Sequence, residues 1–323
     1  MKALALVSGG LDSVLAAKLM LEQGIDVVGV SFESPFFTAD PARASCEELG
    51  IDLDVIDVGG ELLQVIGAPK HGFGRYVNPC IDCHALMVRR AGGRMEELGA
   101  SFVVTGEVVG QRPKSQMRFG LQAVEQESGL TGFLLRPLSA KLLAPTVPET
   151  EGWVDRDKLL GLHGRTRKPQ MELAEKYGIT EYASPAGGCL LTDENYSRVF
   201  RDLRDHGQLS VPAVRMLSMG RQFRLSDDAK LSVGRNHSEN EALFELREEG
   251  QLLLKVVDHK GPVGVLAGDP GEDEIETSAR IVARYSDAPR GESASVQVWN
   301  DRDERRLIDV VPFAPREARR FAI

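Results

Sequence analysis

The sequence predicts an α/β protein in which a parallel sheet with helices on both faces is followed by a smaller α+β domain. In the first half of the chain, short apolar segments alternate with stretches of helical apolar spacing, which is typical of parallel sheets. After about residue 211 the pattern changes to short strand-like segments around one longer helical stretch. A chain of 323 residues is also long enough for two domains.

The first domain is predicted to cover residues 1–195. We expect strands at residues 3–7, 27–32, 53–58 and 102–105, and helices at residues 14–23, 41–49 and 83–98. Residues 136–149 are rich in proline and leucine and predict an extended connection. Residues 155–177 are expected to be helical with a break at residues 161–168, and residues 196–206 to form a charged helix.

The second domain is predicted to cover residues 210–323. We expect strands at residues 223–225, 230–233, 252–257 and 261–268, then a helix at 273–285 and two closing strands at 297–299 and 307–311. This order of strands and one main helix indicates an α+β fold.

Composition excludes several classes of protein. No apolar run approaches the ~20 residues that a membrane-spanning helix needs, and no basic segment precedes an apolar one at the start. Four cysteines in 323 residues favour a reducing, cytoplasmic setting over a disulfide framework. The net charge of −9 argues against indiscriminate nucleic-acid binding, but residues 84–170 carry 13 Lys/Arg against 9 Asp/Glu and predict a local basic face.

A phosphate-sized loop is predicted between the first strand and the first helix, in the run Ser8-Gly9-Gly10-Leu11-Asp12-Ser13. The two glycines let the backbone approach a ligand, and the backbone N–H groups together with the helix dipole favour an anion there. Ser8 and Ser13 add hydroxyl donors. Since a carboxylate repels phosphate, Asp12 indicates that Mg²⁺ lies between them.

This run resembles the SGGxDS signature of the PP-loop ATP pyrophosphatases, which have an adenine nucleotide alpha-hydrolase-like fold. The run lacks the lysine of a Walker A loop. The resemblance implies adenylation, in which ATP activates a substrate oxygen and pyrophosphate leaves. It also implies that ATP and Mg²⁺ bind at three strand ends. The cofactor-binding residues are Ser8, Gly9, Gly10, Asp12 and Ser13 at the first strand end, Phe32 at the second, which is the adenine edge, and Thr105 and Gly106 at the third.

The cysteines allow three chemistries. Cys80 and Cys83 have C-x2-C spacing just before a predicted helix, and Cys189 lies in a Gly-Gly loop. The three thiolates could bind zinc with His84 as a fourth ligand, or form a disulfide or persulfide pair, or hold a [4Fe–4S] cluster with one iron free for sulfide. Cys46 lies within a predicted helix and is interpreted as a small packed residue.

The cysteine pattern resembles the cluster-dependent tRNA thiolation enzymes and the 2-thiouridylases. Residues 78–85 and 105–112 carry this similarity, which covers roughly residues 1–195. The resemblance favours the cluster, with Cys80, Cys83 and Cys189 as ligands and, with Asp12, as catalytic residues. Two departures leave open how tRNA is held and where sulfur comes from: the phosphate loop already begins at Ser8, and no rhodanese-like carrier domain is seen.

Basic residues suggest where RNA binds. Arg165, Arg167 and Lys168 form a dense cluster that suits phosphate contacts. Residues 231–241 resemble the VGRNxxxN element of the NFACT-type RNA-binding domain, and this similarity covers roughly residues 210–312. Within it, Arg235 and Asn236 offer planar donors to phosphate or base edges. Four further basic residues are weaker candidates for neutralising triphosphate or RNA: Arg112, Lys114, Arg136 and Lys141.

Together these observations predict an ATP-dependent tRNA sulfurtransferase that makes thiouridine. It would adenylate a uracil oxygen and replace it with sulfur from a cluster or persulfide. The sulfur donor would be a cysteine desulfurase product, sulfide or a carrier protein, and no membrane partner is expected. The alternatives are an amidotransferase-like ligase on the same fold with a structural zinc site, and a nucleotide-sensing RNA-binding protein.

Overall fold

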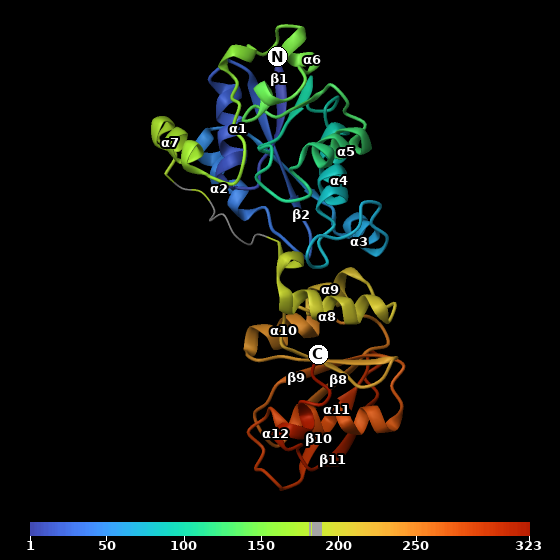
Figure 1. The fold of residues 1–323 in the computed structure, drawn as a ribbon. Helices are drawn as coiled ribbons and strands as arrows, with labels where there is room; N and C mark the ends of the chain where they lie inside the picture. The colour runs from blue at the N-terminus through green and yellow to red at the C-terminus, as the bar shows by residue number, and fades with distance from the viewer. Residues whose placement is uncertain (181, 183–188) are drawn as a thin grey trace. The chain divides into compact units, whose positions relative to one another are not determined.

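The computed structural model describes residues 1–180, 182 and 189–323, and the chain forms two compact units, Met1–Asp193 and Glu194–Ile323 (Figure 1). Part of the predicted loop around Cys189, residues 183–188, lies outside the described residues. Each unit has its own sheet and its own buried core.

The N-terminal unit contains a five-stranded sheet in which each recorded pairing is parallel, with strand order β3-β2-β1-β4-β5. The predicted fold class is confirmed for this unit. Residues 2–6 and 26–33 form the central strands because they are almost continuously apolar, as expected of strands covered on both faces. The strands are β1 (Lys2–Leu6), β2 (Asp26–Glu33), β3 (Leu53–Asp57), β4 (Phe102–Val104) and β5 (Leu134–Leu135).

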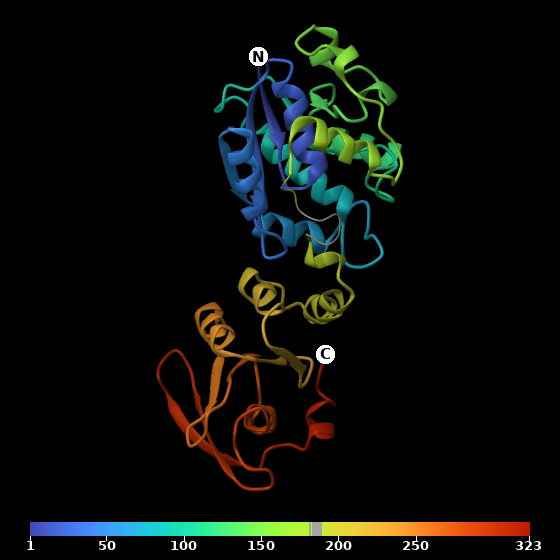
Figure 2. The same ribbon diagram turned by 90° about the vertical axis from the view of Figure 1, so that its left-hand side faces the viewer.

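Helices cover both faces of this sheet (Figures 1 and 2). One face carries α1 (Leu11–Leu21), α2 (Asp40–Leu49) and α7 (Lys168–Tyr177), and the other carries α4 (Cys80–Gly92) and α5 (Arg118–Ser128). The core lies between the sheet and α1, in which Leu11, Leu15, Ala16 and Ala17 are fully buried. The remaining elements are α3 (Gly59–Gly67), α6 (Val147–Thr150), η1 (Ala140–Leu142), η2 (Arg156–Lys158) and η3 (Leu190–Thr192).

Two helix predictions in this unit need correction, and two further helices were not predicted. The predicted helix at residues 83–98 begins at Cys80 and ends at Gly92, since consecutive glycines at 92 and 93 weaken further helix. Of residues 155–177, only η2 and α7 are helical. Helices α3 and α5 were not predicted, because glycines inside both of them obscure the apolar periodicity.

The C-terminal unit contains an antiparallel six-stranded sheet of order β11-β10-β8-β9-β7-β6, which confirms the predicted second sheet domain. Helix α11 packs on one face, while α9 and α10 lie over the other around Leu253 and Val265 (Figure 2). The strands are β6 (Arg221–Arg224), β7 (Ala229–Val233), β8 (Leu252–Val256), β9 (Val263–Gly268), β10 (Ala294–Trp299) and β11 (Arg305–Val310). The helices are α8 (Glu194–Asp205), α9 (Val211–Met216), α10 (His237–Leu246), α11 (Glu272–Arg284) and α12 (Pro315–Ala318).

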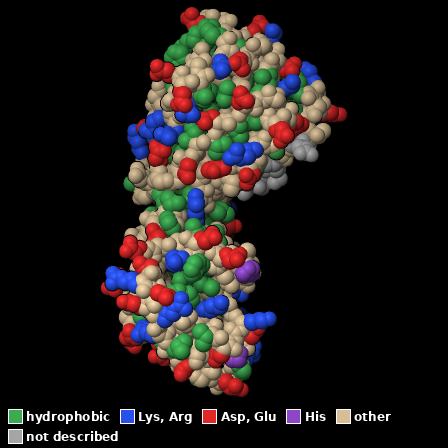
Figure 3. Space-filling model, turned by 180° about the vertical axis from the view of Figure 1, so that it is seen from behind, with side chains coloured by type: hydrophobic (Ala, Val, Ile, Leu, Met, Phe, Trp, Pro, Cys, Tyr) green, Lys and Arg blue, Asp and Glu red, His purple; other side chains and the backbone are tan. Residues whose placement is uncertain are grey.

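The surface carries both signs of charge. On the face shown in Figure 3, basic and acidic side chains are interspersed over both units. Among the described residues, no helix combines the length and the apolar character needed to cross a membrane.

Candidate nucleotide and thiol site

The phosphate loop lies where the sheet geometry predicts a ligand, at the carboxyl end of β1. Gly9 has φ +75°, and a Cβ there would come within 2.4 Å of Pro41 at the start of α2. A Cβ on Gly106, in the loop after β4, would come within 2.5 Å of the Asp12 backbone. The first and fourth strand ends therefore meet at this loop, and both glycines are required by close backbone approach.

Hydroxyl groups fix the conformation of this loop. Ser13 Oγ donates to the Gly10 carbonyl at 2.7 Å and accepts from the Ser8 backbone N–H at 3.2 Å. Ser8 Oγ lies 3.4 Å from Ser13 Oγ. In the first turn of α1, the N–H of Ser13 and that of the next residue donate to the Gly10 carbonyl at 3.0 and 3.2 Å, whereas the two N–H groups before them, from Leu11 on, have no partner within the helix. The loop thus offers donors to an anion at a helix N-terminus.

Asp12 is held in one orientation by residues distant in sequence. Its Oδ2 accepts a hydrogen bond of 2.6 Å from Gln111 Nε2, and Gln170 Nε2 in turn donates to Gln111 Oε1 at 3.0 Å. The other oxygen, Oδ1, is buried and finds no partner within the part of the chain that the structure describes. A buried, unpaired carboxylate oxygen beside a phosphate loop fits a hard divalent cation such as Mg²⁺.

The other predicted nucleotide residues are buried at neighbouring strand ends. Phe32, near the end of β2, is 6% exposed, and Thr105, directly after β4, is 5% exposed. Thr105 Oγ1 donates to Glu107 Oε2 at 3.1 Å. Both residues thus contribute to the structure of the nucleotide-side edge of the sheet.

A buried ion-pair network supports the loop after β4, and the sequence alone did not reveal it. Glu107 Oε2 accepts from Arg136 Nε at 2.9 Å, and Glu107 Oε1 lies 3.0 Å from His84 Nδ1. Arg136 also pairs with Glu125 at 3.3 Å and donates to the Leu121 carbonyl at 2.9 Å. The prediction that Arg136 neutralises triphosphate or RNA is therefore wrong, because its guanidinium is occupied within the core.

We expect this network to make stability depend on acidity. Burial opposes ionisation of Glu107, but Arg136 and His84 outweigh it and lower the pKa of Glu107 to about 2. A lowered folded-state pKa means that the contribution is present above the ordinary pKa of 4.5 and is lost as pH falls toward 2. Urea unfolding across this range should show the loss. Glu107→Gln leaves Arg136 without its buried partner. The free energy of unfolding at neutral pH should therefore fall by about 3–5 kcal/mol in this variant.

The matched variant for this test is Glu61→Gln, because the Glu61 pair with Arg90 is exposed on α3 and α4. Its stability should change by less than about 1 kcal/mol. Equal effects of the two substitutions would contradict a structural role for the buried network.

Three of the four cysteines lie together in the N-terminal unit. Cys80 begins α4, Cys83 follows one turn later on the same face, and Cys189 directly precedes η3. Burial, followed by the neighbouring Cys189, Cys80 and Asp82, raises the pKa of Cys83 well above its ordinary value. Burial, and to a smaller extent Cys80, raises the pKa of Cys189 to about 11. The three thiols are thus neighbours, and the surroundings of Cys83 and Cys189 disfavour uncompensated thiolates.

The sulfur atoms of the thiol site are the type of ligand that soft metals and iron–sulfur clusters prefer. Thiolates are the donors that a positively charged iron–sulfur cluster binds, and the charge of such a cluster would offset the burial that raises the pKa values of Cys83 and Cys189. The described residues contain no group of three or more His, Cys, Asp or Glu side chains already arranged to hold a metal ion. His84, the predicted fourth zinc ligand, is engaged through Nδ1 with Glu107. The fourth cysteine, Cys46, is a packed core residue as predicted, with 2% exposure.

The loop before Cys80 is held by a residue with a different predicted role. Lys114, predicted to neutralise phosphate, donates instead to the carbonyls of His71, Gly72 and Phe73 at 2.6, 3.0 and 2.8 Å. Asn78 Nδ2 lies 3.1 Å from Cys80 Sγ. No sequence signal links Lys114 with a loop more than 40 positions earlier, so sequence reasoning missed this clamp.

The predicted RNA-contact residues lie in both units. Arg165 and Lys168 are exposed near the start of α7, and Arg167 is partly buried there. Asn236 Oδ1 accepts from the Glu239 backbone N–H at 3.0 Å and caps α10. Arg235 forms a 2.6 Å ion pair with Glu239. The last two residues therefore have structural partners of their own.

Comparison with known proteins supports both parts of the predicted resemblance. Residues 1–141 match the family model described as "Thiamine biosynthesis protein (ThiI)", and residues 220–322 match the "NFACT protein RNA binding domain". A tRNA-specific 2-thiouridylase MnmA of Nitratidesulfovibrio vulgaris is 34% identical over 138 residues, which are 38% of this chain and 39% of that protein.

A second curated protein and a solved structure are also similar to this chain. Another MnmA, from Geotalea uraniireducens, is 26% identical over 63% of this chain and 58% of its own length. A solved "4-thiouridine synthetase - RNA complex with bound ATP" is 20% identical, with a TM-score of 0.42 over 75% of this chain and 53% of that one. The chain thus spans less than two thirds of the length of these relatives. It combines an N-terminal domain similar to the tRNA thiouridylases with a C-terminal domain similar to the NFACT RNA-binding domain.

Proposed function

We propose that the chain is an ATP-dependent tRNA sulfurtransferase that converts a uracil carbonyl into a thiocarbonyl. The observation that carries the proposal is the presence, in one unit, of a phosphate loop with an unpaired buried Asp12 oxygen and of three neighbouring thiols. An oxygen-activating site and a sulfur-delivering site are the two parts that this exchange needs. The similarity to MnmA proteins supports tRNA as the substrate.

The first step activates oxygen. The N–H groups and hydroxyls around Ser8 and Ser13 hold the phosphates of ATP, and Asp12 would hold Mg²⁺ against them. The uracil carbonyl oxygen attacks the α-phosphorus, which forms a C–O–P bond and breaks the bond to pyrophosphate. Gln111 keeps the Asp12 carboxylate oriented for this role.

The second step replaces oxygen by sulfur. A sulfur nucleophile at the oxidation level of sulfide attacks the activated carbon, and the C–O bond breaks as AMP leaves with its electron pair. Cys80, Cys83 and Cys189 would hold a [4Fe–4S] cluster, which would supply an iron position for sulfide. In the persulfide form of the proposal, a persulfide donor such as a cysteine desulfurase first transfers a sulfur atom to one cysteine. The outer sulfur of this persulfide attacks the activated carbon, and AMP leaves. A second cysteine then attacks the inner sulfur, which releases the thiocarbonyl and leaves a disulfide that a thiol reductant restores.

Product analysis tests this function directly. Anaerobically prepared protein, unmodified tRNA transcripts, ATP and a sulfur source, either sulfide or a cysteine desulfurase with cysteine, should yield a thiolated uridine that is detected by mass spectrometry of the digested tRNA. Release of pyrophosphate with incorporation of ammonia would support the amidotransferase-like ligase instead. If neither product forms and RNA binding depends on nucleotide, the result would support the nucleotide-sensing RNA-binding protein.

We expect tRNA binding to weaken steeply with salt, because Lys and Arg side chains release counterions from phosphates. Triple charge reversal at Arg165, Arg167 and Lys168 should lower the slope of log Kd against log[salt] by about 2–3 if these residues contact phosphates. Filter binding at 50–300 mM salt measures this slope.

A matched triple reversal at Arg302, Arg305 and Arg306 keeps the change in net charge while altering the β10–β11 end of the C-terminal unit. It should reduce the slope less. Equal slopes for wild type and the Arg165 triple variant would remove this cluster from the RNA-contact surface.

A further inference from the structure

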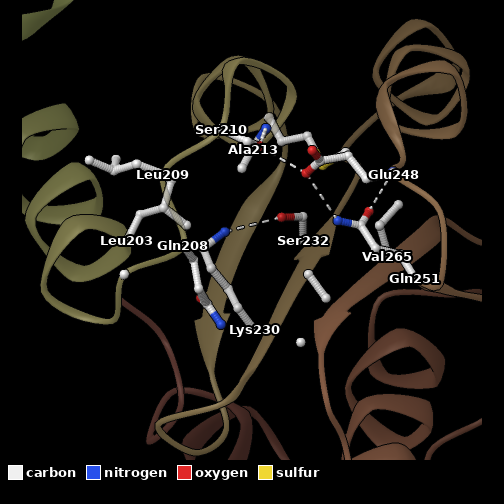
Figure 4. Close-up of a pocket in the computed structure, with 14 residues that line it drawn as sticks. Leu203, Gln208, Leu209, Ser210, Ala213, Lys230, Ser232, Glu248, Gln251 and Val265 are labelled. Carbon is white, nitrogen blue, oxygen red and sulfur yellow. Dashed lines mark hydrogen bonds between the residues drawn. The ribbon is translucent and has the colours of Figure 1, made fainter. Parts of the chain in front are cut away.

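The C-terminal unit contains a pocket that the thiolation proposal does not use. It has a volume of about 320 Å³ and lies over the face of the sheet opposite α11 (Figure 4). The volume is within the range of small-molecule sites, and aliphatic side chains supply much of the lining. Its polar side chains are Gln208, Ser210, Lys230, Ser232, Glu248 and Gln251.

Lys230 is the central polar group, and its amine is fixed. It is 5% exposed on β7 and donates to Gln222 Oε1 and, at 3.3 Å, to Ser232 Oγ. The Gln222 amide cannot turn away, because its Nε2 donates to the carbonyls of Met216 and Met219 at 2.9 and 2.6 Å. Of the three protons of an ammonium group, two are thus used, and one is available to a ligand.

The positive charge of Lys230 lacks a direct counter-ion among the described residues. The nearby carboxylate Asp202, on α8, is paired at 2.7 Å with Arg224 of β6. Burial, and next the Arg224 charge, lower the pKa of Lys230 to about 7, while Asp202 acts in the opposite direction. Since buried charges are normally paired, an anionic ligand group would satisfy this amine.

A carboxylate is fixed elsewhere in the same pocket. Glu248 Oε2 accepts from Ser210 Oγ at 2.8 Å, and Gln251 Nε2 lies 3.5 Å from the same oxygen (Figure 4). Ser210 is itself held, because its Oγ also accepts from the Ala213 backbone N–H at 3.1 Å. Both hydrogen bonds use one oxygen, so the carboxylate keeps acceptor capacity for a ligand. A simple anion would be repelled here, whereas a ligand with N–H donors opposite its anionic group would fit both ends.

We propose that this pocket binds a guanine nucleotide, with the phosphate at Lys230 and the base N–H groups at Glu248. A lysine ammonium is a common phosphate binder, and the adjacent N1–H and N2–H₂ groups of guanine can donate together to one carboxylate. Unpaired bases in RNA are read through such edges, so a free mononucleotide and an unpaired RNA nucleotide offer the same chemistry. The proposal goes beyond thiolation and is tested separately from it.

Met216 provides a local reporter, since it lines the pocket. In full-length protein with ¹³C-labelled methionine methyl groups, the Met216 signal is assigned with Met216→Leu. Addition of guanosine 5′-monophosphate should shift this signal saturably, and uridine 5′-monophosphate should bind about tenfold more weakly. A second titration uses a 5′-phosphorylated oligonucleotide that begins with guanosine. If only the mononucleotide or only the oligonucleotide shifts the signal, the result shows whether the pocket takes a free nucleotide or an RNA nucleotide.

Substitutions separate the two ends of the ligand. Lys230→Gln should weaken guanosine 5′-monophosphate binding about tenfold or more, while Lys255→Gln, at an exposed lysine of the same sheet, should not change it. Glu248→Gln, which preserves shape, should remove the preference over uridine 5′-monophosphate. In wild type, affinity should fall as pH rises from 7 to 9, because the Lys230 ammonium loses its proton.

Absence of a Met216 shift with millimolar guanosine 5′-monophosphate and with the oligonucleotide would overturn the proposal. A shift that survives both Lys230→Gln and Glu248→Gln would do the same. If Lys230→Gln does not fold, the Glu248→Gln preference and the pH dependence of the wild type still decide the matter.

Discussion

Replacing Asp12 with asparagine should reduce tRNA-dependent pyrophosphate release about 100- to 1000-fold, the loss typical of removing one electrostatic group that stabilises a transition state. The substitution keeps the shape of the side chain and an oxygen that can accept from Gln111. It removes the charge with which the unpaired Oδ1 would hold Mg²⁺. Release of labelled pyrophosphate from ATP measures the effect.

Asp26→Asn is the matched control, since Asp26 begins β2 at the opposite end of the same sheet and pairs only weakly with Lys2, at 3.4 Å. It should release pyrophosphate at the wild-type rate. Gln111→Leu should lie between the two, because it frees the Asp12 carboxylate without removing its charge. An Asp12→Asn protein with unchanged turnover would rule out the adenylation step in the form given above.

The second large effect is expected at the thiols. Cys83→Ser and Cys189→Ser should each reduce thiolated uridine to background, about 10³-fold or more, because a hydroxyl cannot carry the transferred sulfur. Both replacements keep side-chain volume nearly unchanged. Pyrophosphate release should persist in these variants, since oxygen activation is assigned to the phosphate loop.

Cys46→Ala separates this effect from a general loss of thiols. Cys46 is packed in the core, where burial raises the pKa of its thiol to about 11, and it lies beside Gly29. This variant should lose some stability and keep thiolation. A Cys83→Ser protein that still thiolates tRNA would exclude both the cluster and the persulfide assignment.

The same variants distinguish the forms of sulfur delivery. Iron and sulfide analysis of anaerobic wild-type protein should give about four of each per chain if a [4Fe–4S] cluster is held, and Cys80→Ser, Cys83→Ser and Cys189→Ser should each lose it. A colourless active protein with a Cys80–Cys189 disulfide after turnover supports persulfide transfer. One tightly bound zinc in active protein would instead support a structural site.

Local patterns made most of the N-terminal sheet predictable. Its strands are continuous apolar runs because both faces of the sheet are buried. The glycine–serine run at residues 8–13 is a local motif, and its residue types alone predict an anion-binding loop. The C-x2-C pair was also readable, although the helix begins three residues earlier than predicted. One signal was overlooked: Asn236 followed three positions later by Glu239 is a helix-start pattern, and α10 begins there.

Long-range contacts were not predictable in the same way. Gln111 reaches Asp12 across 99 positions, and Lys114 clamps three carbonyls of the loop at residues 71–73. Arg136 illustrates the general reason. A basic residue near a candidate site predicts a phosphate contact, but only the fold shows that Glu107 and Glu125 already occupy it. Partner choice among charged residues depends on tertiary structure, which a single sequence does not display.

The most direct test is the stoichiometry of the coupled reaction. Anaerobic protein is incubated with unmodified tRNA transcripts, labelled ATP and sulfide, and pyrophosphate and thiolated uridine are counted in the same samples. We expect both products to depend on tRNA and to form in a 1:1 ratio in wild-type protein. Thiolated uridine without pyrophosphate, or pyrophosphate that forms equally without tRNA, would contradict this expectation.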